Sequence, residues 1–247
     1  MPAMIHRLRG TFLSSALKKA LNRIGYAVQP IDQAPWENWH GLTSLPIRTV
    51  LDIGALHGEL AETILAPRFP NAIIHCFEPS PVSFPALEQT AARSAGRIVA
   101  YPFGLGETEA QVEFYSNRDF LASSSFLHQT DVAVGEFPLL EKVDVTRAQI
   151  RRLDDVAPGL HLAAELLVKI DTQGFEDRVI KGGRETLRGA RACVIEISLV
   201  ALYHGIPSFE FIHTQMIELG FRFSGILDQV HGSTGEVLYF DAVFVRR

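Results

Sequence analysis

The segment Val50–Leu60, VLDIGALHGEL, constrains the fold of this chain more than any other. Its first residues have the apolar, β-branched composition of a short buried strand, which only Asp52 interrupts. Gly54 and Gly58 then bracket a turn, and Glu59–Phe69 has the apolar spacing of a helix. A strand, a glycine-containing turn and a helix in succession predict a loop whose backbone approaches a ligand closely.

Strand-like and helix-like segments alternate along the chain from Thr49 onward. Strands are expected over residues 49–53, 72–77, 97–103, 142–146, 166–170 and 192–197, and helices over 59–69, 81–94, 175–180 and 209–219. Phe221–Leu227 and Glu236–Val245 flank a glycine-containing turn, which predicts a hairpin. This order predicts an α/β fold: a doubly wound, mostly parallel sheet, covered by helices on both faces, with a C-terminal antiparallel hairpin.

The region between the strands expected over 97–103 and 142–146 is less regular. Residues 111–115 alternate strictly between apolar and polar, which is typical of an edge strand or a hairpin arm. Ser116–Gly135 is polar and irregular. A segment of this length indicates a lid, a binding loop or a disordered stretch, and the sequence leaves the three open.

The composition narrows the class of protein. A net charge of −5 argues against a dedicated nucleic-acid binder. No apolar run reaches the roughly 18–20 residues of a membrane-spanning helix. Cys76 and Cys193 each stand in an apolar run, so we expect both to be buried and reduced rather than joined in a disulfide. Together these features predict a cytoplasmic protein.

Residues 1–31 differ from the rest because they carry basic side chains and no acid. Their apolar positions fit one stripe of an amphipathic helix, formed by Leu13, Leu17, Ala20, Leu21 and Ile24. This helix is expected to pack as an ordinary element, with contact to a membrane surface or a role in targeting as the alternatives. We place a helical extension and linker at residues 1–45 and the main domain at residues 46–247.

The glycine turn itself limits the ligand. It lacks the second glycine of a dinucleotide fingerprint, and the residue after Gly58 is an acid where a phosphate loop has lysine. An acid in the turn suits a cationic ligand such as S-adenosylmethionine, whose ammonium end Asp52 would face. Glu78, in CFEPS, ends the second strand, where a carboxylate can accept both ribose hydroxyls. The alternative is that Glu78 caps the helix expected at Pro81.

The sequence resembles the FkbM family of S-adenosylmethionine-dependent methyltransferases from about Thr49 to Arg246. The resemblance rests on VLDIGALHGEL, CFEPSP, GLGETEAQVEFY, the serine triplet at 123–125, VKIDTQGFEDRVIKGG, VIEIS, YHGIPSFEFI and DAVFVRR. Val168–Gly183 is the most specific of these segments. Leu56 is a departure, because the family commonly has Asn at this position, where a side-chain contact to the cofactor would be lost.

This resemblance implies a seven-stranded, Rossmann-like class I methyltransferase domain that uses S-adenosyl-L-methionine. The implied reaction is O-methylation of a sugar, a glycoconjugate or another small-molecule natural product, with no nucleic acid as partner. The residues expected to contact the cofactor are Asp52, Gly54, Ala55, Gly58, Glu78, Pro79, Gly104 and Leu105.

Three residues are candidates for the acceptor side of the site. Asp171 ends the strand 166–170, where it could take a proton from a hydroxyl or help to hold a divalent cation. Glu196 follows the next strand, with a structural salt bridge as the alternative. His204 is the third candidate, as a base or a substrate contact, because the pKa of histidine suits proton exchange near neutrality. Glu176 serves either the site or the helix dipole.

The sequence leaves the metal and the reaction class open. Asp171, Glu196 and His204 have no spacing that marks a strong metal site, so no metal ligand is assigned. The alternatives to a methyltransferase are a module that binds S-adenosylmethionine without catalysis and a nicotinamide-dependent oxidoreductase. The missing glycine disfavours the oxidoreductase.

Overall fold

The computed structural model describes residues 39–246 of the 247 in the chain. The amphipathic helix predicted within residues 1–31 lies outside the described residues. The chain divides into two compact units, Met1–Gly41 and Leu42–Arg247, and the second is described here. The domain boundary predicted after residue 45 stays a prediction.

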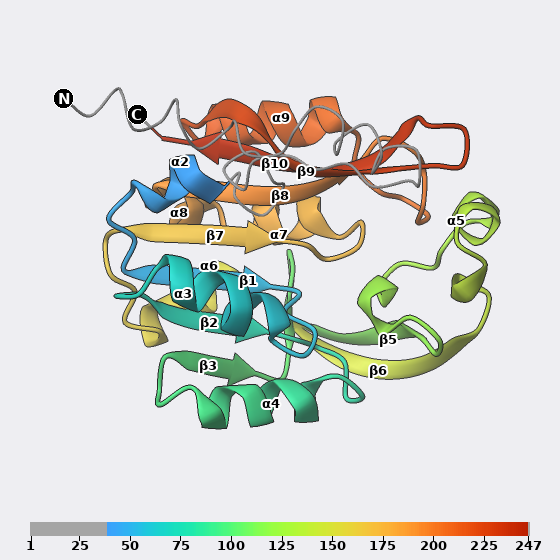
Figure 1. Cartoon of the computed structure of the whole chain (residues 1–247). Coiled ribbons are helices and arrows are strands. Elements are labelled where there is room, and N and C mark those ends of the chain that lie inside the picture. The colour runs from blue at the N-terminus through green and yellow to red at the C-terminus, as the bar shows by residue number, and fades with distance from the viewer. Residues whose placement is uncertain (1–38, 247) are drawn as a thin grey trace, which may run out of the picture. The chain divides into compact units, whose positions relative to one another are not determined.

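A seven-stranded sheet forms the centre of this unit, as predicted (Figure 1). Its strand order is β3-β2-β1-β7-β8-β10-β9; β10 pairs antiparallel with both β8 and β9, and the other adjacent pairs are parallel. The strands are β1 (Thr49–Ile53), β2 (Ile73–Phe77), β3 (Ile98–Tyr101), β7 (Leu166–Ile170), β8 (Ala192–Ser198), β9 (Arg222–His231) and β10 (Val237–Val245). The central strands β1 and β7 are buried along their whole length, because each is covered on both faces.

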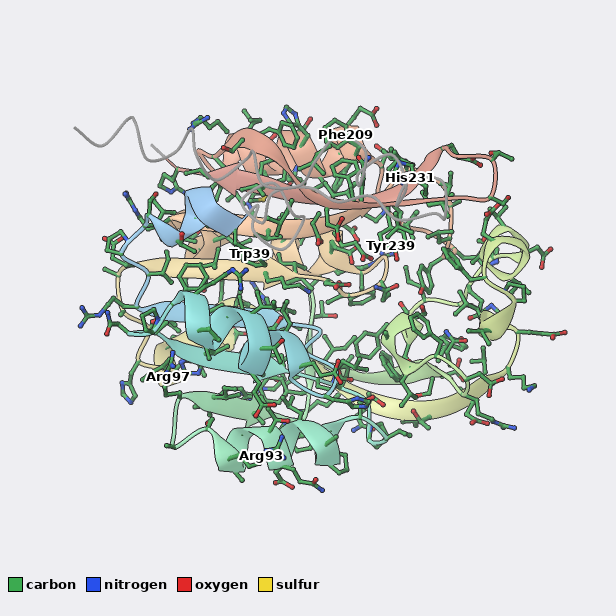
Figure 2. All side chains as sticks on the ribbon, viewed as in Figure 1. Trp39, Arg93, Arg97, Phe209, His231 and Tyr239 are labelled. Carbon is green, nitrogen blue, oxygen red and sulfur yellow. The ribbon has the colours of Figure 1, made fainter. Side chains whose placement is uncertain are left out.

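Helices flank the sheet, with α3 in front of it and α6 and α7 behind it in Figure 1. The helical elements are α2 (His40–Thr43), η3 (Ala61–Leu65), α3 (Ala66–Arg68), α4 (Phe84–Arg93), α6 (Leu153–Val156), η6 (Ala157–Gly159), α7 (Glu176–Gly182), α8 (Arg184–Arg188) and α9 (Phe209–Glu218). The Arg97 side chain fixes the end of α3, since its Nη2 donates to the carbonyl oxygens of Ala66 and Phe69 at 3.0 and 2.9 Å (Figure 2).

Two helices differ from the sequence prediction. The helix after the glycine turn begins at Glu59, as predicted, but it contains a π-helical segment, η3, just before Pro67, which has no N–H to donate to the preceding turn. The helix expected from Pro81 begins at Phe84 instead. The Ser80 hydroxyl accepts from the backbone N–H groups of Val82 and Ser83, and these bonds hold a separate turn before the helix.

A second, three-stranded sheet was not predicted. It comprises β4 (Gly104–Leu105), β5 (Ala110–Asn117) and β6 (Val143–Arg151), in the order β4-β6-β5. The strand expected over 111–115 is therefore an arm of this sheet, antiparallel to β6. The segment between β5 and β6 contains η4 (Leu121–Ser123), α5 (Asp131–Glu136) and η5 (Pro138–Leu140), so the stretch expected to be irregular is partly ordered.

The core of the main sheet is apolar and includes both cysteines. Phe77, Ile170 and Phe244 are among its largest fully buried side chains. Cys76 and Cys193 are buried and unbridged, as predicted. Among residues 39–246, no helix is long and apolar enough to cross a membrane.

Gly54 lies where the loops after β1 and β7 meet. Its φ is +86°, and a Cβ at this position would lie 1.8 Å from the carbonyl oxygen of Asp171. The Asp171 N–H donates to the Ile53 carbonyl at 3.0 Å, which keeps the two loops in contact. Gly54 was predicted to allow the backbone to approach a ligand. That expectation stays a prediction, and the structure adds a second reason for glycine: the Asp171 backbone occupies the space of a side chain.

We predict that Gly54→Ala destabilises the protein more than Gly96→Ala does. Gly96 has nearly the same φ, +84°, and among the described residues nothing lies within 4 Å of the Cβ it lacks. The control therefore carries only the conformational penalty, about 1–2 kcal/mol. Gly54→Ala adds a collision worth at least about 2 kcal/mol more. Urea unfolding measures both free energies, and equal values would mean that the loops separate without penalty.

Candidate active site

A cavity of about 330 Å³ lies at the carboxyl ends of β1, β2 and β7, within the described part of the chain. The second sheet contributes Gly104, Leu105 and Phe114 to its wall. The residues predicted to contact the cofactor that line this cavity are Asp52, Gly54, Ala55, Glu78, Pro79, Gly104 and Leu105. Gly58 is the exception: a Cβ there would lie 2.8 Å from a methyl carbon of Leu87, so this glycine serves the packing of α4.

Glu78 is held in the cavity wall by backbone donors. One carboxylate oxygen accepts from the Leu56 N–H and the other from the Ser80 N–H, both at 2.8 Å. Burial raises the pKa of Glu78 to about 7, and the two backbone bonds oppose this rise. Glu78 does not cap α4, whose N-cap is Ser83. Each oxygen keeps a lone pair for a further donor, which is what a ribose diol needs.

Leu56 has a left-handed backbone conformation, which asparagine adopts more readily than leucine. Its φ is +50°. The contact with Glu78 uses the backbone N–H and does not depend on the side chain. The departure of Leu56 from the family pattern therefore leaves this part of the turn intact.

Asp52 lies in the cavity wall with its carboxylate fully buried. Its Oδ1 has no hydrogen-bond partner among residues 39–246. Burial raises the pKa of Asp52 to about 6, the nearby Lys169 lowers it, and Asp171 raises it. A buried acceptor without a donor fits a cationic or hydrogen-bonding ligand, because such a group is stabilised by pairing.

Lys169 is a charged residue of the site that sequence reasoning missed. Its Nζ lies 2.8 Å from Asp171 Oδ2, and its side chain is 8% exposed. Burial lowers the pKa of Lys169, but the carboxylates of Asp171, Asp52 and Asp241 outweigh burial and raise the pKa above its usual value. A lysine inside the otherwise apolar strand LLVKI was the signal that could have revealed it.

The side chain of Gln173 connects Asp171 and Glu196 by hydrogen bonds. Gln173 Nε2 donates to Asp171 Oδ1 at 2.8 Å and to Glu196 Oε1 at 3.0 Å. Asp171 lines the cavity, whereas Glu196 is not among the residues of the cavity wall. Burial, followed by repulsion from Asp171 and Asp241, raises the pKa of Glu196 well above its usual value.

Asp241 is a second acid that the sequence analysis did not single out. It lines the cavity and is paired with Glu196 across β10 and β8. Burial raises the pKa of Asp241 to about 6. An acid within the apolar alternation of β10 was the available signal.

Two predicted residues have other positions or roles. His204 is exposed and is not part of the cavity wall; its backbone N–H donates to the His128 carbonyl at 2.9 Å. Its neighbour Tyr203 is buried, and the Tyr203 hydroxyl donates to Gln173 Oε1 at 2.8 Å, so Tyr203 is the residue of this segment that contacts the Gln173 side chain. Glu176 Oε1 accepts from the backbone N–H groups of Thr172 and Gly174, a local role in the turn before α7.

The described residues include no metal centre. Among residues 39–246, no group of three or more His, Cys, Asp and Glu side chains is arranged to hold a metal ion. The ammonium of Lys169 is the cation that the structure supplies to these acids.

The comparisons with known proteins identify the family of this chain. The family described as the methyltransferase FkbM domain matches residues 52–223, which is more than half of the chain. The chain belongs to the FkbM methyltransferase family. This FkbM protein is thus an S-adenosylmethionine-dependent methyltransferase, which decides between the enzyme classes that the sequence left open. The residues that fit the cofactor are Glu78, with its free lone pairs, and Asp52, with its unpaired oxygen.

Two curated relatives of this FkbM protein are 28–29% identical to it in sequence, and one solved structure of similar fold is 16% identical. The 2-O-methyltransferase NoeI of Sinorhizobium fredii is 29% identical over 186 residues, covering 69% of this chain and 76% of NoeI. The AMB antimetabolite synthetase AmbE of Pseudomonas aeruginosa is 28% identical over 204 residues, covering 72% of this chain and 10% of AmbE. The crystal structure of methyltransferase FkbM from Methylobacillus flagellatus KT has a TM-score of 0.51 at 16% identity, covering 81% of this chain and 44% of that one, and shows the shared fold.

We predict that Glu78→Gln weakens S-adenosylmethionine binding in a pH-dependent way. The pKa of about 7 means that the Glu78 carboxylate becomes ionised as the pH rises from 6 to 8. Because the ionised form is the better acceptor, the wild type gains affinity over this range and the variant does not. At pH 8 the wild type should bind more tightly by about 2 kcal/mol. At pH 6 the ratio of the two affinities should be about tenfold smaller than at pH 8.

Calorimetry on both proteins at the two pH values measures this difference. The ionisation of the ligand itself cancels in the comparison, because both proteins are titrated with the same compound. A gap that is the same at pH 6 and pH 8 would contradict the assignment of Glu78 as a titrating contact.

We predict that Leu56→Asn stabilises the protein. Asn tolerates a φ of +50°, and the relief should be worth about 1 kcal/mol. The N–H bond to Glu78 remains, so S-adenosylmethionine affinity should not fall. Ala95→Asn is the matched control, with a φ of +53° outside the cavity. Thermal unfolding tests both variants. If Leu56→Asn alone destabilises the protein, the packing of the Leu56 side chain contributes more stability than its backbone conformation costs.

Proposed function

We propose that this FkbM methyltransferase transfers a methyl group to a hydroxyl of a sugar, a glycoconjugate or another small-molecule natural product. The observation that carries the proposal is Asp171, a carboxylate in the wall of the cavity that also contains Asp52 and Glu78. The relation to NoeI, which is described as a 2-O-methyltransferase, supports a hydroxyl acceptor.

The cofactor half of the proposal rests on the β1 and β2 ends of the cavity. Glu78 would accept the ribose hydroxyls, and Asp52 would face the cationic amino-acid end. Bound S-adenosylmethionine supplies an already activated methyl group on a sulfonium. Catalysis by the protein therefore consists mainly of holding the acceptor oxygen close and in line.

The acceptor half rests on Asp171 and its two donors. Lys169 and Gln173 each donate to one oxygen of Asp171, and both oxygens keep a lone pair for the acceptor hydroxyl. The two donors hold the carboxylate of Asp171 in one orientation in the cavity wall. A hydroxyl becomes far more acidic as its oxygen gains a methyl group, so a carboxylate placed beside it can take the proton. Glu196 shares the Gln173 donor with Asp171.

The apolar part of the cavity lining favours acceptors with an apolar face. Phe114, Leu121 and Phe126 are among the lining residues. Apolar side chains of this kind exclude water from the reacting atoms and pack against the carbon-bound hydrogens of a sugar or a polyketide.

The acceptor class can be tested with the purified protein and S-adenosylmethionine labelled in its methyl group. We expect label to enter methyl glycosides and other compounds with free hydroxyls as an O-methyl ether, identified by mass spectrometry. Amine analogues of the same compounds serve as the comparison. Transfer to the amines and not to the hydroxyls would overturn the proposal.

We predict that Asp171→Asn lowers the methyl-transfer rate by about 10²–10⁴-fold, the usual scale for a lost proton acceptor. S-adenosylmethionine affinity should change little, because the proposed ribose and amino-acid contacts are made elsewhere. Asp155→Asn, at an exposed acid outside the cavity, is the control and should keep wild-type activity. The proton-acceptor role is wrong if Asp171→Asn turns over like the control.

A further inference from the structure

Both the nitrogen and the oxygen of the Gln173 side-chain amide are hydrogen-bonded within the site. The backbone of Gln173 has a φ of +55°, and Gly174 follows with a φ of +96°, so the chain turns sharply after Asp171. Because Nε2 faces the carboxylates of Asp171 and Glu196, the orientation of the amide is determined and Oε1 must point the other way.

Tyr203 meets the Gln173 amide from a segment 30 residues further along the chain. Its hydroxyl lies 2.8 Å from Gln173 Oε1 and 2.9 Å from the carbonyl oxygen of Ser123. Tyr203 is 3% exposed. One hydroxyl proton can be donated to one acceptor at a time, so Tyr203 joins the two segments by alternating between them. Donation to Oε1 polarises the amide and strengthens its bonds to Asp171 and Glu196.

The Ser123 contact brings a part of the cavity wall into the same network. Leu121, Ala122, Ser124 and Phe126 line the cavity, and we refer to residues 121–126 as the wall segment. Ser125, which is 1% exposed, donates from its hydroxyl to the Gln173 carbonyl at 2.8 Å. The wall segment is thus attached to residue 173 by two side chains, those of Ser125 and Tyr203.

We infer that Tyr203 is a positioning residue for methyl transfer, which acts through Gln173 to orient Asp171 and holds the wall segment against the acceptor side of the cavity. The inference rests on the proposed function for the role of Asp171. Within the YHGIP motif, the inference gives the role at the site to Tyr203 in place of His204, which is exposed. Tyr203 has the contacts to do this, because it touches both the amide that fixes Asp171 and the backbone of the wall.

Tyr203→Phe tests the inference because it removes one oxygen and keeps the ring. Hydrogen–deuterium exchange on the protein without ligand should show the backbone amides of the wall segment and Leu127 exchanging about 5- to 10-fold faster, the scale of one lost hydrogen bond. The S-adenosylmethionine affinity, measured by calorimetry, should stay within about twofold. Tyr115→Phe is the matched control: its hydroxyl bonds to Glu113 at the surface, and its exchange should equal that of the wild type.

Ser125→Ala is a second variant that breaks the other attachment. It should accelerate exchange in the same segment, whatever the effect of Tyr203→Phe on folding. Unchanged exchange in both variants, or an equal change in Tyr115→Phe, would overturn the attachment of the wall.

Turnover separates positioning from a merely structural role. With a methyl glycoside as acceptor, Tyr203→Phe should lower kcat about tenfold, leave the KM for S-adenosylmethionine unchanged, and shift the pH profile of kcat. A variant with wild-type kcat and pH profile would overturn the action on Asp171. This outcome is distinct from failure of the proposed function, because the exchange experiment needs neither an acceptor nor an active Asp171.

Discussion

The ammonium of Lys169 lies 2.8 Å from Asp171 Oδ2, inside a sheet whose central strands are fully buried. The carboxylates of Asp52 and Asp241 also attract this ammonium and, with Asp171, raise the pKa of Lys169. An ionised carboxylate in such surroundings is stable only when it is paired and hydrogen-bonded. The position of Lys169 therefore allows several acids to occupy one small cavity. In the proposed function, these carboxylates serve the cationic cofactor and the hydroxyl acceptor, and Lys169 is the cation that holds them together.

Much of the sheet could be predicted, because its signal is local. The residues of β1 and β7 are those expected, since both strands are short, apolar runs that end at a charged residue or a glycine. The carboxyl ends of parallel strands lie at one edge, so Glu78 and Asp171 could be assigned to a common cleft from sequence order alone. The FkbM resemblance then supplied the reaction that such a cleft serves.

The remaining features depend on contacts between segments far apart in the chain. Nothing near residue 203 indicates that Tyr203, and not His204, meets Gln173. The second sheet forms because β6 pairs with β5 and β4, and the short β4 has no periodicity of its own. The reason for Gly54 was also hidden, because the atom that excludes a side chain belongs to residue 171.

A crystal structure of the protein with S-adenosylhomocysteine tests the central claim most directly. The account predicts that both ribose hydroxyls bond to the Glu78 carboxylate, that the amino-acid end lies beside Asp52, and that the sulfur faces the side of the cavity formed by Asp171. The backbone of residues 54–56 should hold the positions it has without the ligand. A ribose bound away from Glu78, or a sulfur turned away from Asp171, would contradict the account.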